Sequence, residues 1–114
     1  MRYSAKQGDI IWVSLDPQAG HEQKGRRPAI VVSNNSFNSF TKTAAMVCPI
    51  TNTTRPFPLH VALDNRTSTT GVIMCEQAKV LDVQQRKAEF IEQAPEDIIF
   101  EVADIIRGLI EIEK

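Results

Sequence analysis

The chain has 114 residues, 42% of them apolar and 24% charged, and its 13 basic and 14 acidic side chains give a net charge of −1. This length predicts one domain over residues 1–114 with a modest core and excludes a second domain. The near-neutral charge excludes the general basic signature of nucleic-acid-binding proteins. Because residues 95–114 hold six acids and only two bases, the rest of the chain is net positive, and a local basic patch is expected at residues 24–27.

Signals for targeting, disulfides and metals are weak. The N-terminal residues 1–9 contain no apolar h-region, and no run approaches the ~20 apolar residues that span a bilayer, so we expect a cytoplasmic protein without a membrane partner. Cys48 and Cys75 stand in apolar surroundings and are expected to be buried core residues rather than a disulfide. His21 and His60 lack metal-ligand spacing, so we predict no metal site and no cofactor.

The first half of the chain reads as β-strands. An apolar run over residues 9–15 predicts the first strand, and the Asp-Pro dipeptide that follows it excludes a helix. Residues 16–26 form a long loop punctuated by glycine, and such loops in compact domains are often functional. A second strand over residues 28–33 is predicted to begin at Pro28 and to be buried on both faces. Asn35 or Ser36 is then expected to cap a single helical turn.

The middle of the chain continues this pattern. A third strand is predicted over residues 43–50, and Pro49 is expected to confine it to a sheet edge, a bulge or the strand end, with Thr51 following directly. Residues 52–58 read as a turn-rich linker. Three more strands are predicted over residues 59–63, 71–75 and 78–82.

The end of the chain predicts a helix that begins at Pro95. Acidic residues in its first turn suit the positive end of the helix dipole, and apolar residues recur at helical spacing from Ile98 to Ile110. That stripe is expected to pack on the sheet while the acids face water. The residues therefore predict a small, mostly antiparallel barrel or curved sheet closed by a C-terminal helix.

Arg27 is the most suggestive single residue. It stands at the start of the second predicted strand, beside a polar loop that carries one carboxylate and one amide, Glu22 and Gln23. The guanidinium group offers a planar fork of donors that matches an anion such as phosphate. The pattern therefore predicts a phosphate contact at this strand.

Four segments stand in a specific order and spacing: GDIIWV (residues 8–13), GHEQKGRRPAIVV (20–32), CPIT (48–51) and CEQAK (75–79). Together they resemble the MazF/PemK family of bacterial toxin endoribonucleases over essentially the whole chain. The resemblance implies a small SH3-like barrel of the CcdB/PemK type, with about six to seven mostly antiparallel strands and a C-terminal helix. It also implies an mRNA interferase, active as a symmetric homodimer, that cleaves single-stranded RNA at short sequences without a metal.

A partner is implied as well. Members of this family are inhibited by a cognate antitoxin whose disordered acidic tail occupies the RNA groove of the toxin. The resemblance therefore implies an antitoxin partner for this chain, and contact with DNA only indirectly, through that antitoxin.

Site residues follow from the same resemblance. The family's catalytic arginine before proline falls on Arg27, and its threonine at the end of the third strand falls on Thr51. Positions that the family uses near the RNA fall on Glu22, Gln23, Asn34, Glu76 and Gln77. A second arginine, Arg26, departs from the common pattern and leaves open which cation contacts which phosphate.

The expected chemistry uses the RNA's own 2′-OH as nucleophile. The enzyme must align this hydroxyl with the scissile phosphorus, assist removal of its proton and stabilise the phosphorane. Arg27 suits the last task because it stays protonated and donates bidentately, and Thr51 can donate a further hydrogen bond. Both Glu22 and His21 remain open as the general base. The expected products carry a 2′,3′-cyclic phosphate and a 5′-OH.

Two other function classes stay open at this point. One is a non-enzymatic toxin on the same barrel that poisons a topoisomerase, as CcdB-like toxins do; it would leave RNA intact. The other is a small adaptor barrel that binds RNA or peptide without cutting it, and its RNA retention would survive replacement of Arg27 by a smaller cation.

Overall fold

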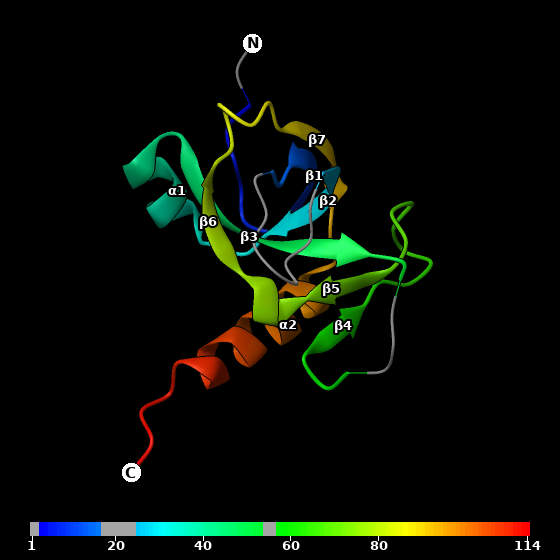
Figure 1. The fold of residues 1–114 in the computed structure, drawn as a ribbon, viewed down its shortest axis with the longest axis vertical. Helices are drawn as coiled ribbons and strands as arrows, with labels where there is room; N and C mark the ends of the chain where they lie inside the picture. The colour runs from blue at the N-terminus through cyan, green and yellow to red at the C-terminus, as the bar shows by residue number, and fades with distance from the viewer. Residues whose placement is uncertain (1–2, 17–24, 54–56) are drawn as a thin grey trace.

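The computed structural model describes residues 3–16, 25–53 and 57–114, which form seven strands and two α-helices (Figure 1). The strands are β1 (Asp9–Ser14), β2 (Arg26–Val31), β3 (Ala44–Thr51), β4 (His60–Ala62), β5 (Val72–Met74), β6 (Lys79–Asp82) and β7 (Glu89–Gln93). The helices are α1 (Asn35–Thr41) and α2 (Glu96–Leu109), with a 3₁₀ turn, η1 (Cys75–Gln77), directly after β5. This confirms the predicted fold class.

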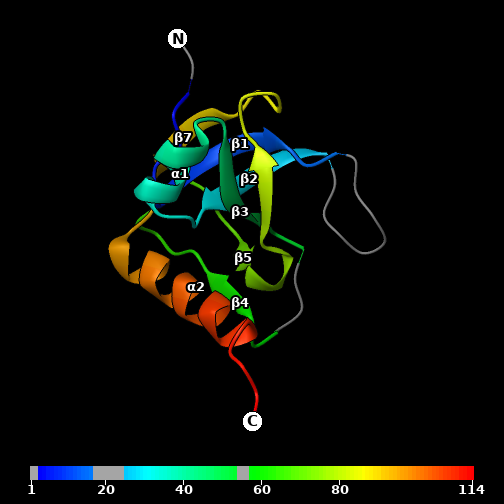
Figure 2. The same cartoon turned by 90° about the vertical axis from the view of Figure 1, so that its left-hand side faces the viewer.

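The strands form one curled sheet in the order β4-β5-β3-β2-β1-β7, with β6 also paired with β3. All pairings among the described residues are antiparallel, and none of them joins β4 to β7, so the sheet is barrel-like without being closed. Both views show α1 near one end of the sheet and α2 at the other, against β4 (Figures 1 and 2).

The strand β3 lies in the interior of this sheet, so the sheet edge, one of the three positions expected for Pro49, is wrong. It pairs with β2 on one side; on the other side its first half pairs with β6, and Ile50 and Thr51 pair with β5. Pro49 lies between these last two pairings, so the residue without an N–H falls where the strand changes partner. The prediction of a start at Pro28 was also wrong, since Pro28 is the third residue of β2 and lies opposite Trp12.

Two hydrophobic clusters fill the two faces of the central strands. One lies between the sheet and α2 and includes Ile10, Ile30, Ile50, Ile73, Ile98 and Val102; the other lies inside the curl of the sheet and includes Ile11, Val13, Ala29, Val31, Val47 and Leu81. Alternate residues of β2 enter alternate clusters, which confirms that this strand is buried on both faces. Cys48 and Cys75 are buried and free, as predicted.

The helix α2 packs over only part of its predicted stripe. Ile98 and Val102 are buried, whereas Leu109 is 48% exposed and Ile110, which lies beyond the helix end, is 77% exposed. Pro95 is the N-cap residue rather than the first helical residue. Neither helix in the described ranges has the length and apolar character needed to cross a membrane.

The helix α1 and the strand β7 also differ from the prediction. The helix α1 has seven residues instead of a single turn, and its cap is Asn34, whose side-chain oxygen accepts the Phe37 N–H at 2.8 Å. The strand β7 was not predicted, because Phe90 and Ile91 are exposed and the segment pairs with β1 at the edge of the sheet. Edge strands that bury little apolar surface leave a weak sequence pattern.

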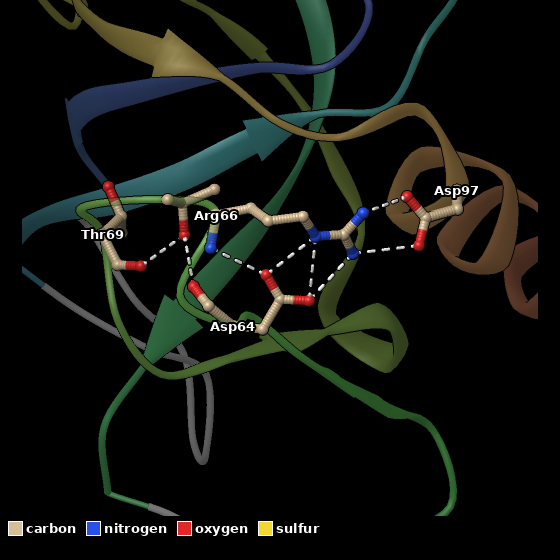
Figure 3. A network of polar contacts seen from close by, with 5 residues as sticks. Asp64, Arg66, Thr69 and Asp97 are labelled. Atoms are coloured by element: carbon tan, nitrogen blue, oxygen red, sulfur yellow. Dashed lines mark hydrogen bonds and ion pairs between the residues drawn. The ribbon is translucent and has the colours of Figure 1, made fainter.

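Ionic contacts fix the loop between β4 and β5 (Figure 3). The guanidinium of Arg66 donates to both oxygens of Asp64 and to both oxygens of Asp97 in the first turn of α2. Glu92 of β7 accepts the backbone N–H groups and the hydroxyls of Ser68 and Thr69 at 2.8 to 3.0 Å. The loop is thereby held to both α2 and β7.

Because three carboxylates of this network have lowered pKa values, we expect the fold to lose stability in acid. Hydrogen bonds from Arg66 lower the pKa of Asp64 to about 2 and also lower the pKa of Asp97. Burial alone would raise the pKa of Glu92, but hydrogen bonds from Thr69 and Ser68 outweigh it and the pKa is lowered. A group with a lowered folded-state pKa stabilises the fold above its unfolded pKa and loses that contribution as the pH falls through the folded pKa.

We therefore expect wild type to be more stable than an Asp97→Asn variant at pH 7, and this difference to shrink as the pH falls below about 4 and through the lowered pKa of Asp97 in the folded state. Urea midpoints measured from pH 7 down to pH 2 check this expectation. A difference that stays constant over the whole range would contradict it.

Candidate active site

The strand register places Arg27 and Thr51 on one face of the sheet, at neighbouring strand ends. The pairs between β2 and β3 are Ala29 with Pro49, Ile30 with Cys48, and Val31 with Val47. This ladder ends at Ala29 and Pro49; counted two residues further, its register would place Arg27 opposite Thr51. Directly opposed residues point to the same face of a sheet, with Cβ atoms roughly 4.5–5.5 Å apart. The two predicted catalytic residues thus project from neighbouring strand ends on one face.

The neighbouring arginines of β2 point to opposite faces, because successive strand residues alternate. Arg26 donates to the backbone carbonyls of Arg86 and Lys87 and forms an ion pair with Glu89 at 2.7 Å. Arg27, half-buried, lies opposite Val13 of β1, whose side chain belongs to the cluster inside the curl. Arg26 therefore holds the turn before β7, and of these two arginines Arg27 is the one on the face of Thr51.

Thr51 is the last residue of β3 and is 4% exposed. Its Oγ1 accepts the backbone N–H of Thr53 at 3.1 Å. A hydroxyl oxygen that accepts one hydrogen bond keeps its own O–H as a donor, and the Thr53 N–H fixes the position of that oxygen. The geometry leaves the Thr51 hydroxyl able to donate to an anion.

Within the described residues, the structure does not bring the other predicted site residues together with Arg27 and Thr51. Glu76 and Gln77 lie in η1, which follows the end of β5 opposite to Val72, the partner of Thr51. Asn34 is not brought to the Arg27–Thr51 pair: it follows the opposite end of β2, and its amide oxygen caps α1. Three predicted residues lie outside the described ranges: the RNA contacts Glu22 and Gln23, and His21, which with Glu22 was a candidate general base.

Sequence reasoning considered His60 only as a metal ligand and missed its contact with Glu76. His60 Nε2 lies 3.1 Å from Glu76 Oε2, and the ring packs edge-on against Phe57 with centroids 5.0 Å apart. Its Nδ1 is buried without a hydrogen-bond partner among the described residues. The signal would have been the β4–β5 pairing, which sets His60 opposite Met74, two residues before Glu76.

Within residues 3–16, 25–53 and 57–114, no three His, Cys, Asp or Glu side chains are grouped so as to hold a metal ion. The polar groups beside Thr51 include the Thr53 N–H, the Asn52 amide and the Thr70 hydroxyl, and Arg27 shares its face of the sheet. Such groups bind and orient an anionic substrate through charge and hydrogen bonds.

Comparison with known sequences gives a consistent family. The family described as "PemK-like, MazF-like toxin of type II toxin-antitoxin system" matches residues 6–110. Endoribonuclease PemK of Escherichia coli is 41% identical over 101 residues, covering 85% of this chain and 75% of that protein. Endoribonuclease toxin MazF of Escherichia coli strain K12 is 38% identical over 88 residues, covering 76% and 77%.

Solved structures agree. MazF from Deinococcus radiodurans (Form-I) is 36% identical, with a TM-score of 0.87 over 94% of this chain and 96% of that one. A MazE–MazF structure from the same organism (Form-II) is 28% identical, with a TM-score of 0.80 over 97% and 99%. The resemblance and the fold predicted from the sequence are thereby confirmed. The chain belongs to the PemK-like, MazF-like toxins of type II toxin–antitoxin systems, and the relatives named above are endoribonucleases.

Proposed function

We propose that this chain is a toxin that cuts single-stranded RNA, mRNA in the cell, and so arrests translation and growth. The observation that carries the proposal is the β2–β3 register, which sets a guanidinium and a hydroxyl on one face of adjoining strands. RNA provides the 2′-OH nucleophile, so a site that aligns the chain and stabilises developing charge is sufficient. The products would be a 2′,3′-cyclic phosphate and a 5′-OH.

Arg27 and Thr51 have distinct roles in this proposal. Arg27 stays protonated and donates bidentately to the non-bridging oxygens of the phosphorane, whose charge exceeds that of the ground state. The Thr51 hydroxyl, held by the Thr53 N–H, donates a further hydrogen bond to the same group. A single donor of this kind contributes about 10²–10³-fold to the rate.

Contacts with the RNA bases are proposed for polar side chains outside this pair. Glu76 and Gln77 project from η1, and Glu76 is held by His60, which suits it to read a base edge. Glu22 and Gln23 are proposed as contacts from the loop before β2. Asn34 would meet the RNA only beyond the far end of β2, where its oxygen already caps α1.

Assembly and location are proposed from the family. We propose that residues 1–114 act as one toxin domain, that two copies form a homodimer, and that a cognate antitoxin with an acidic tail inhibits it in the cytoplasm. The MazE–MazF structure similar to this chain supports an antitoxin partner. DNA would be contacted only through the antitoxin.

The purified protein is expected to cut a long single-stranded RNA at a few sites in the presence of EDTA. A short substrate with a 2′-deoxy nucleotide at a mapped site should resist cleavage, because the nucleophile is missing, while its all-ribose counterpart is cut. Mass spectrometry of the fragments identifies the cyclic phosphate. Intact RNA would contradict the proposal, and cleavage of the 2′-deoxy substrate would contradict its mechanism.

Two further outcomes separate the rival functions. Intact RNA together with inhibition of a topoisomerase would favour a CcdB-like toxin. Stable RNA binding without cleavage would favour an adaptor barrel.

A further inference from the structure

The loop between β4 and β5 reaches the backbone of Thr51. Gly71 has a φ of +116°, and a Cβ placed on it would lie 2.5 Å from the Thr51 carbonyl oxygen and 2.9 Å from its carbonyl carbon. Beside it, the Thr70 hydroxyl lies 3.1 Å from Asn52 Oδ1, to which it donates. Glycine is required where φ is positive and two backbones come this close. The end of the loop therefore packs directly on the segment that carries the Thr51 hydroxyl.

The preceding residues of this loop are anchored elsewhere. Arg66 lies between the carboxylates of Asp64 and Asp97 and joins the loop to α2 (Figure 3). Glu92 accepts four hydrogen bonds from the two residues directly before Thr70. The loop closes at its base through the Leu63 N–H, which donates to the Gly71 carbonyl at 2.9 Å. A continuous series of contacts thus runs from α2 and β7 through the loop to Thr51.

We propose that this loop positions Thr51 for cleavage, with Gly71 as the contact and Arg66 and Glu92 as anchors. These three are positioning residues, since they act through Thr51; the inference rests on the function proposed for that hydroxyl. A displacement of about 1 Å in a catalytic group costs about 10²-fold in rate. The fixed loop prevents such a displacement of β3 at its last residue.

Arg66 also has a rival interpretation, as a contact with an RNA phosphate. Its side chain is 48% exposed, but the guanidinium already donates to two carboxylates, so the group as a whole carries no spare positive charge. A phosphate contact would affect the KM for RNA and its salt dependence. A positioning role instead affects kcat, because the lost interaction matters only when Thr51 meets the transition state.

The test compares Arg66→Ala with Arg107→Ala. Arg107 is a matched control because it is 73% exposed and pairs with a neighbouring carboxylate, Asp104, at 3.5 Å. On a short RNA, Arg66→Ala should lower kcat about tenfold with KM changed less than about twofold, whereas Arg107→Ala should leave both at the wild-type value. Arg66→Lys, which keeps the charge but cannot bridge two carboxylates bidentately, should be intermediate.

Two further variants locate the effect at Thr51. Gly71→Ala should lower kcat at least as much as Arg66→Ala, provided that circular dichroism shows a folded protein. If this variant does not fold, the comparison of Arg66→Ala with Arg107→Ala is still a complete test. In a Thr51→Ala background, Arg66→Ala should have no further effect on the residual rate, because interacting residues are not additive.

The outcomes separate this inference from the proposed function. A wild-type protein that leaves RNA intact would overturn the proposed function, and the positioning role with it. If wild type cleaves, the positioning role alone is overturned by any of three results: a kcat for Arg66→Ala equal to that of Arg107→Ala, a change confined to KM, or an undiminished loss in the Thr51→Ala background.

Discussion

Replacement of Arg27 by alanine is expected to abolish RNA cleavage and leave the fold intact. The change removes both the fixed charge and the donor fork from the face that carries Thr51, and we expect kcat to fall by about 10³-fold or more. Arg27→Lys should recover only part of the rate, since an ammonium keeps the charge without the fork. Because Arg27 is half-buried near a strand end, we expect the free energy of unfolding to change by about 1 kcal/mol or less. Cleavage kinetics in EDTA and urea unfolding measure the two effects.

Arg26→Ala is the matched control for this prediction. It removes the same charge one residue away, from the opposite face of β2, where the side chain holds Glu89 and the carbonyls of Arg86 and Lys87. We expect a small loss of stability and a kcat within about threefold of wild type. The reverse pattern, with cleavage lost in Arg26→Ala and kept in Arg27→Ala, would contradict this prediction and assign the phosphate contact to Arg26.

Sequence periodicity predicted the elements that bury much apolar surface, and it missed the edge strand β7, which buries little. The runs that became β1, β2, β3 and α2 supply both hydrophobic clusters, so their pattern follows directly from burial. The strand β7 exposes Phe90 and Ile91 and is held by backbone pairing with β1. Backbone pairing at an edge carries no side-chain signature, so only the assembled sheet shows this strand.

The proline rules failed for a related reason. They assume that a strand in the interior of a sheet uses every N–H in one continuous ladder. In this sheet β3 changes partner from β6 to β5 around Pro49, and the β2–β3 pairing begins at Ala29, just after Pro28. Both positions are interruptions in a ladder inside a curled sheet, and no local pattern in the sequence distinguishes them from a strand end.

The candidate site also contains residues that could be predicted from local sequence motifs and contacts that could not. Arg27 and Thr51 were predicted because their motifs are local in the sequence, and the strand register places them on one face of the sheet. The contact between His60 and Glu76, and the approach of Gly71 to the Thr51 carbonyl, join residues 16 and 20 positions apart and depend on strand pairing. Sequence could therefore name the chemical groups, whereas the groups that hold them in place required the fold.

Replacement of Val102 by aspartate is expected to unfold the protein. Val102 is fully buried in α2 and packs in the cluster between that helix and the sheet. A carboxylate there would lose its hydration among apolar side chains such as Ile10 and Ile98. We expect a loss of about 4 kcal/mol or more, a large part of the 5–15 kcal/mol that typically stabilises a domain. Urea unfolding followed by circular dichroism measures the loss.

Phe100→Asp tests whether burial, rather than the apolar character of the helix, sets this cost. Phe100 is larger than Val102 and lies on the same helix, but it is 68% exposed, so its replacement should change the free energy of unfolding by less than about 1 kcal/mol. Because α2 also carries Asp97, the anchor of Arg66, cleavage should be lost with Val102→Asp and retained with Phe100→Asp. Equal destabilisation by the two changes would mean that burial of the replaced side chain does not set the cost of a carboxylate on α2.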